Sequence, residues 1–111
     1  MSNSLVADVR DLKSRLEWGR PAFTVIDTRD RLAYNQGHII GAISIPLDQL
    51  EDCVLSTLHR ERRIYIYGDN QAQSTQAVRS LQLLGFKAVA VLNGGLQAWK
   101  TIGGAVEGIA A

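Results

Sequence analysis

The chain has 111 residues, which fits one domain with one hydrophobic core, and 46% of them are hydrophobic, as in ordinary globular proteins. Its net charge is +1 and its charged residues are scattered, so the composition excludes a strongly basic surface for nucleic acid or anionic membranes. The densest charged run is 60–63 (RERR), which we interpret as a solvated approach to the next strand.

Cysteine usage limits the chemistry further. Cys53 is the only cysteine, so neither an intramolecular disulfide nor a zinc site of paired cysteines can form. We expect no metal ion and no cofactor. The N-terminus has no long apolar run, which indicates neither a signal peptide nor a membrane span, and we therefore expect a cytoplasmic protein.

The N-terminal segment predicts a helix after a short lead-in. Residues 1–4 are expected to be disordered, and a short edge strand would follow near residues 5–6. Asp8 is a suitable N-cap for a helix that would end near Trp18, just before Gly19.

Short apolar strands then alternate with amphipathic helices. This order is typical of βαβ units, and it predicts a small three-layer α/β domain with a parallel sheet covered by helices on both faces. In chain order we expect a strand over 23–27, a helical turn over 30–36, a strand over 42–45, a helix over 47–58, a strand over 64–67, a helix over 74–84, a strand over 88–92 and a helix ending near 102.

The segment 63–85 organises the chain, because it joins a buried strand to a helix through a polar loop over 68–73. Loop amides and a helix N-terminus together favour an anion, and in open α/β sheets ligands bind at the carboxyl ends of the strands. The loop itself holds no cysteine, serine, histidine, lysine or arginine, and its only charge is Asp69. The predicted scaffold suits anion chemistry, but its side chains do not supply that chemistry.

Three motifs resemble those of rhodanese-like sulfurtransferase domains. Residues 27–29 (DTR) are similar to the family's D-x-R, and 37–42 (GHIIGA) to its G-H-I-P-G-A, while 93–99 (NGGLQAW) resemble its terminal G-G-x-x-A-W. The chain is identified as a member of this family, with one domain over 1–111, a core over about 6–104 and a frayed tail over 105–111. The resemblance implies a mainly parallel five-stranded sheet with helices on both faces.

The resemblance also implies what the loop should contain. In active members it begins with a cysteine that accepts sulfur from a donor such as thiosulfate, and it ends with an arginine that holds the anionic donor. Here Gly68 stands in place of the cysteine, Gln73 in place of the arginine, and Asp69 at a position that is often basic. We therefore expect no catalytic residue and a vestigial active-site loop made of Gly68, Asp69, Asn70, Gln71, Ala72 and Gln73.

The polar residues near this loop are candidates for binding. Asp27 and Arg29 could form a charged pair, which the resemblance implies is a structural brace, with ligand contact as the alternative. The loop side chains could hydrogen-bond a neutral amide or a cationic partner, or could simply form a solvated loop. The candidate binding residues are Asp27, Arg29, Asp69, Asn70 and Gln73.

Other residues with potential chemistry have structural interpretations. Cys53, in the predicted helix over 47–58, is expected to be a small buried hydrophobe, with a reactive or sulfur-carrying thiol and an intermolecular contact as alternatives. His38 is expected to hydrogen-bond the backbone and hold a turn rather than to act as an acid or base. Trp18 and Trp99 are expected to pack in the core.

The leading functional hypothesis is a catalytically inactive rhodanese-like domain that acts as a binding or regulatory module for an unidentified protein partner. One alternative is a thiosulfate-type sulfurtransferase that uses Cys53 or a thiol from a partner. Another is an inert structural piece of a larger protein, joined through the tail after Gly103. Neither nucleic acid nor membrane is expected as a partner.

Overall fold

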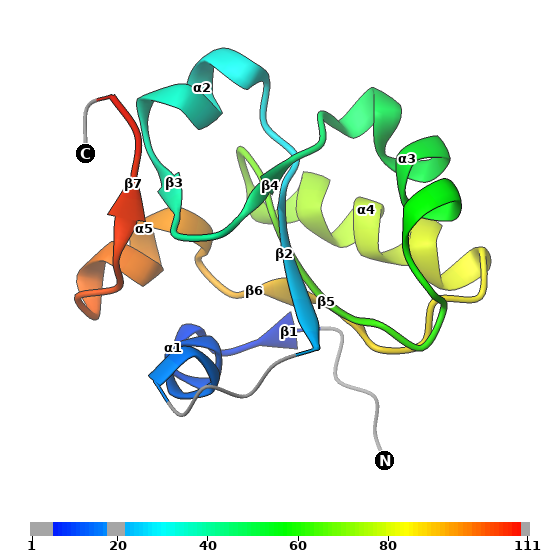
Figure 1. Ribbon diagram of the computed structural model, residues 1–111, viewed down its shortest axis with the longest axis horizontal. Coiled ribbons are helices and arrows are strands. Elements are labelled where there is room, and N and C mark those ends of the chain that lie inside the picture. The colour runs from blue at the N-terminus through cyan, green and yellow to red at the C-terminus, as the bar shows by residue number, and fades with distance from the viewer. Residues whose placement is uncertain (1–5, 18–21, 110–111) are drawn as a thin grey trace.

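The computed structural model describes residues 6–17 and 22–109, and within these residues five strands form one sheet (Figure 1). The strand order is β1-β6-β5-β2-β4, and adjacent strands are parallel. The strands are β1 (Val6–Ala7), β2 (Phe23–Asp27), β4 (Ile43–Ser44), β5 (Arg63–Tyr67) and β6 (Val89–Leu92).

Helices cover both faces of this sheet. On one face lie α1 (Val9–Glu17) and α5 (Gly95–Thr101), and on the other lie α3 (Leu50–Thr57) and α4 (Gln71–Leu83) (Figure 1). The predicted α/β architecture, with a parallel five-stranded sheet and helices on both faces, is confirmed. Within the described ranges no helix is long and apolar enough to cross a membrane.

The side-chain alternation of β5 divides the core into two halves. Ile64 and Ile66 pack in the half that contains α3 and α4, whereas Tyr65 and Tyr67 pack in the half that contains α1 and α5. Because successive side chains of a strand point to opposite faces, a continuous apolar run is what a central strand requires. Four of the five β5 residues are buried, as the sequence pattern indicates.

A small antiparallel pair lies beside the main sheet, and the sequence did not reveal it. It joins β3 (His38–Ile39) to β7 (Val106–Glu107), next to α2 (Arg31–Gln36) (Figure 1). The Ile40 amide donates to the Ala105 carbonyl at 3.1 Å. Residues 105–109 therefore do not form the predicted frayed tail, because their backbone groups find partners far away in the sequence. The expectations for residues 1–4, Trp18 and residues 110–111 lie outside the described residues.

Several element boundaries differ from those predicted. The helix expected from Ser74 begins at Gln71, because Asn70 acts as its N-cap and accepts a hydrogen bond from the Gln73 amide at 2.9 Å. The loop between β5 and α4 consequently spans only residues 68–70. The helix expected over 47–58 is divided into a 3-10 turn, η1 (Leu47–Gln49), followed by α3.

Candidate functional site

Gly68 follows β5 and lies against the end of β2. The Thr28 amide donates to the Tyr67 carbonyl at 2.9 Å, and the Thr28 hydroxyl donates to the same oxygen at 3.1 Å. A Cβ atom on Gly68 would lie 2.6 Å from Thr28 Oγ1 and 3.3 Å from Ser74 Oγ. The close approach of Thr28 therefore favours glycine here, and a larger residue would require that hydroxyl to move.

The first turn of α4 is capped by the side chain of Asn70. Asn70 Oδ1 accepts from the Gln73 amide, and the Asn70 carbonyl accepts from the Ser74 amide at 3.2 Å. The buried Ser74 hydroxyl also donates to the Asn70 carbonyl, at 3.0 Å. The helix start is thus capped from within the chain, which weakens it as an anion site.

Gln71 connects this helix start to the turn that precedes α5. Its Oε1 accepts from the Gly94 amide and its Nε2 donates to Asn93 Oδ1, both at 3.4 Å. Gly94 has a φ of 76°, in the left-handed region that favours glycine. The resemblance to G-G-x-x-A-W thus marks a turn that contacts Gln71, next to the loop after β5.

A hollow of about 400 Å³ lies beside the loop. Of the candidate binding residues, it brings together Arg29, Asp69 and Asn70, whereas Asp27 and Gln73 do not line it. Sequence reasoning missed Leu96 and Lys100, which lie one turn apart on α5 and both line the hollow. Leu96 and Lys100 are four residues apart, and this spacing, which places two side chains on the same face of a helix, could have predicted that they act together.

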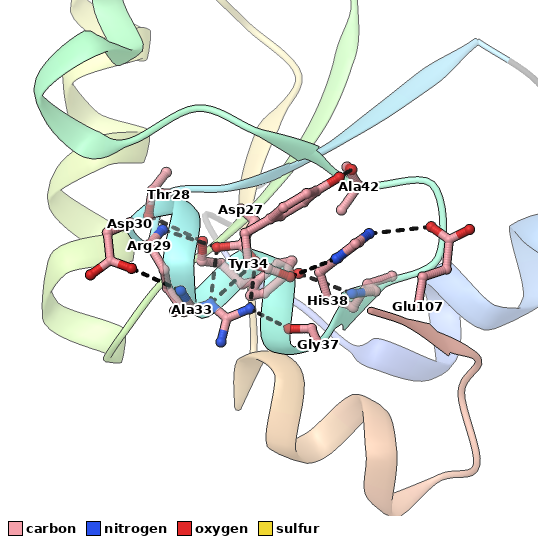
Figure 2. A network of polar contacts seen from close by, with 12 residues as sticks. Asp27, Thr28, Arg29, Asp30, Ala33, Tyr34, Gly37, His38, Ala42 and Glu107 are labelled. Atoms are coloured by element: carbon pink, nitrogen blue, oxygen red, sulfur yellow. Dashed lines mark hydrogen bonds and ion pairs between the residues drawn. The ribbon is translucent and has the colours of Figure 1, made fainter. Parts of the chain in front are cut away.

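Arg29 and the fully buried Asp27 form a tight ion pair (Figure 2). Arg29 Nη2 donates to Asp27 Oδ2 at 2.7 Å and to the Gly37 carbonyl at 2.6 Å, and Nε donates to Asp27 Oδ1 at 3.0 Å. Hydrogen bonding to Asp27 raises the pKa of Arg29. The pair braces the end of β2 against the turn after α2.

Tyr67 extends this brace into the core. Its hydroxyl accepts a hydrogen bond from the Ile39 amide at 3.0 Å, which attaches β3 to the main sheet. Burial, followed by the negative charge of Asp27, raises the pKa of the Tyr67 hydroxyl above its ordinary value. The hydroxyl is therefore held as a neutral phenol and serves a structural purpose.

His38 contacts neighbours outside the hollow (Figure 2). Its Nδ1 lies 2.8 Å from the Tyr34 carbonyl, its Nε2 lies 3.3 Å from Glu107 Oε1, and its ring stacks on the Tyr34 ring with centroids 3.7 Å apart. Glu107 Oε1 also accepts from the Gly41 amide at 3.2 Å. His38 thus joins α2, β3 and β7, and it contacts backbone as expected.

Cys53 is half-buried on α3 rather than fully buried, and it packs against the core half that contains Leu50 and Val54. It does not line the hollow beside Gly68.

Trp99 is buried, and its Nε1 donates to the Ala105 carbonyl at 2.8 Å. The tryptophan is a core residue that also holds the segment leading into β7.

Side chains of both charges line the hollow. Its charged lining residues are Arg29, Lys100 and Asp69, and it contains neither a thiol nor an imidazole among the described residues. The same part of the chain holds no group of three or more His, Cys, Asp or Glu side chains able to bind a metal ion. The lining can donate and accept hydrogen bonds and can hold a charged group.

Comparison with known proteins connects this geometry to a family. The family model of the rhodanese-like domain matches residues 8–102. The uncharacterized protein YqhL of Bacillus subtilis is 32% identical over 75 residues, which cover 68% of this chain and 59% of that protein.

Two solved structures are also similar. The crystal structure of the Alr3790 protein from Anabaena sp. is 52% identical, covers 95% of this chain and 94% of that chain, and has a TM-score of 0.90. The thiosulfate sulfurtransferase from Pseudomonas aeruginosa is 29% identical, with a TM-score of 0.85, and covers 93% of this chain but 20% of that one. The match of the family model, which covers most of the chain, shows that this protein belongs to the rhodanese-like domain family.

Proposed function

We propose that this chain is a rhodanese-like domain that binds a protein partner in the cytoplasm and does not itself transfer sulfur. The observation that carries the proposal is the position of Gly68. Gly68 directly follows β5, where the resemblance implies a sulfur-accepting cysteine. A Cβ atom at this position would clash with the Thr28 hydroxyl. Sulfur transfer requires a thiolate at this point, and glycine has no side chain to provide one.

The surroundings of Gly68 support the same proposal. The Gln73 amide bonds to the Asn70 side chain, so it is not directed at a bound donor. Gln73, where the resemblance implies an arginine, does not line the hollow. The hollow nevertheless persists, with hydrogen-bonding groups on several sides, and a binding role uses it without covalent chemistry.

A sulfurtransferase that uses Cys53 is the second candidate, and two observations favour it. Cys53 is half-buried, so its thiol has some access to solvent, and the similar protein from Pseudomonas aeruginosa is a thiosulfate sulfurtransferase. Against it, Cys53 lies on α3 and does not line the hollow beside Gly68. Donor and thiol would therefore have to meet at a different surface.

Transfer of sulfur from thiosulfate to cyanide tests the two candidates. Each turnover would release sulfite and thiocyanate, so thiocyanate measures it directly. We expect the wild-type protein and Cys53→Ser to give no thiocyanate above the buffer blank. Turnover that Cys53→Ser abolishes would establish the second candidate, and turnover that survives this change would contradict both, because no thiol would remain in the chain.

A further inference from the structure

One wall is shared by two neighbouring hollows. The hollow beside Gly68 has about 400 Å³, and a second, of about 460 Å³, extends from it between α2, α5 and β7. Figure 1 shows α5 and β7 together beside the main sheet. The lining residues common to both hollows are Arg29, Leu96 and Lys100, which we call the shared wall.

Arg29 has hydrogen-bond donors to spare on this wall. Its Nε and Nη2 atoms bond to Asp27 and to the Gly37 carbonyl, which fixes the plane of the guanidinium. No described residue accepts a hydrogen bond from Nη1, and this nitrogen does not belong to the buried atoms that lack a partner. The Arg29 side chain is 14% exposed and lines both hollows, so Nη1 retains N–H donors for an acceptor from outside the chain, such as a carboxylate.

Lys100 supplies the net positive charge of the wall. Asp27 neutralises the charge of Arg29, whereas no carboxylate of a described residue lies within 4.0 Å of the Lys100 ammonium. In the second hollow Arg29 and Lys100 are the only charged lining residues among those described, and the remainder are Ala33, Gln36, Gly37, Leu96, Gly104 and Val106. The second hollow is thus mostly apolar and both of its charged lining residues are positive, whereas the negative Asp69 lines the first hollow and not the second.

We propose that the shared wall binds an acidic peptide segment of a partner protein, with one carboxylate between Arg29 Nη1 and Lys100 Nζ. Aliphatic side chains of the segment lie over Leu96 and extend into the second hollow. Charge complementarity selects the acidic segment, and the fixed guanidinium gives the contact its geometry. The inference deepens the proposed function and rests on it, because a sulfur-transferring domain would need the first hollow for its donor.

A pair of peptides and a pair of variants test this inference. The probe is a short fluorescein-labelled peptide of glutamate, leucine and glycine, and its reference replaces each glutamate by glutamine. We expect the glutamate peptide to bind and the glutamine peptide not to bind. Lys100→Gln should weaken the affinity for the glutamate peptide about tenfold, because one charge-assisted contact is lost. Lys87→Gln is the matched control, because it removes the same charge from a side chain that is 76% exposed and lies outside both hollows.

Chemical-shift mapping locates the contact. Addition of the glutamate peptide should move the Leu96 and Gly104 amides and the Arg29 Nε–H signal. Equal binding of both peptides, no binding of either, equal weakening by Lys87→Gln, or shifts confined to other surfaces would each overturn the inference. The thiocyanate assay stays blank in all these cases if the proposed function holds, so the two failures are distinguishable.

Discussion

Two regions at the carboxyl edge of the sheet differ sharply in how their polar groups are used. Around α2 and β3, the side chains of Asp27, Arg29 and His38 each have protein partners at hydrogen-bond distance (Figure 2). Around the start of α4, the side chains of Asn70, Gln71 and Ser74 are hydrogen-bonded to uncharged groups. Asp69, the one charged residue of this loop, contributes no hydrogen bond or ion pair among the described residues, and Gly68 has no side chain. The braced region and the loop after β5 are adjacent, and Arg29 contributes to the brace and also lines the hollow beside the loop.

We infer from this difference that the fold depends more on the brace than on the loop after β5. Asp27 is 0% exposed, so removal of its partner would leave a buried charge, and the brace is needed whatever the loop does. The loop holds no such buried charge, because its only ionisable side chain, Asp69, is exposed. Fold and chemistry are therefore separable in this chain, and the predictions below test that separation.

The largest expected effect follows from breaking the brace. Arg29→Ala leaves the Asp27 carboxylate buried without its cation, and we expect a loss of about 3–5 kcal/mol in the free energy of unfolding, measured by urea denaturation. Arg10→Ala is the control, because Arg10 is 79% exposed and pairs only at the surface; it should cost under about 1 kcal/mol. Equal losses for the two variants would show that Asp27 and Arg29 do not brace the fold.

A smaller effect is expected where the brace enters the core. Tyr67→Phe leaves the Ile39 amide without its acceptor and should cost about 1–3 kcal/mol. Tyr65→Phe is a matched control on the same strand face, since the buried Tyr65 hydroxyl has no partner among the described residues. It should be neutral or slightly stabilising. A Tyr65→Phe loss as large as that of Tyr67→Phe would contradict the assignment.

The raised pKa of Tyr67 also predicts how the stability of the protein depends on pH. Its pKa is raised in the folded state, so above about pH 10 the unfolded chain loses the proton while the folded chain keeps it. Stability should therefore be fully present below this pH and decrease as the pH rises further. Urea midpoints across the alkaline range should show this decrease for the wild type and a weaker one for Tyr67→Phe. Identical slopes would exclude Tyr67 as its source.

In the loop after β5, added side-chain volume should lower the free energy of unfolding, whereas removal of the Asp69 charge should not. Gly68→Ala places a Cβ against the Thr28 hydroxyl and should cost about 1–2 kcal/mol. In a double-mutant cycle with Thr28→Ala, part of that loss should be recovered, because the crowded oxygen is removed. Asp69→Asn, as the charge control, should change stability by less than about 0.5 kcal/mol. Additive effects of Gly68→Ala and Thr28→Ala would show that the two residues do not crowd each other.

The smallest effect is expected at the contact between β3 and β7. Glu107→Gln weakens the acceptor for the Gly41 amide, and because this glutamate is half-exposed, the global loss should be under about 1 kcal/mol. Hydrogen exchange should accelerate at the Gly41 and Ile40 amides. Glu61→Gln, which removes a distant exposed carboxylate, should leave both amides unchanged. Unchanged exchange in Glu107→Gln would show that the carboxylate does not hold β7.

The sequence by itself determined the elements whose signals are local. Short, mostly apolar runs marked β2 and β5 as buried strands. The helical turn expected over 30–36 is α2, with Asp30 as its N-cap, because a cap acts on the nearest backbone groups. The motif over 93–99 and the loop after β5 were also found from sequence, as were Arg29, Asp69 and Asn70, three of the residues that line the hollow. Each of these signals lies within a few residues of the structure that it predicts.

The tertiary structure alone decided the features that join distant segments. The pairing of β3 with β7 brings His38 to Glu107, and the close approach of Thr28 to Gly68 involves residues that directly follow two different strands. The shared wall likewise places Arg29 beside residues of α5. Such contacts depend on how the chain closes loops of many residues, and short-range periodicity carries no information about which distant side chains then meet.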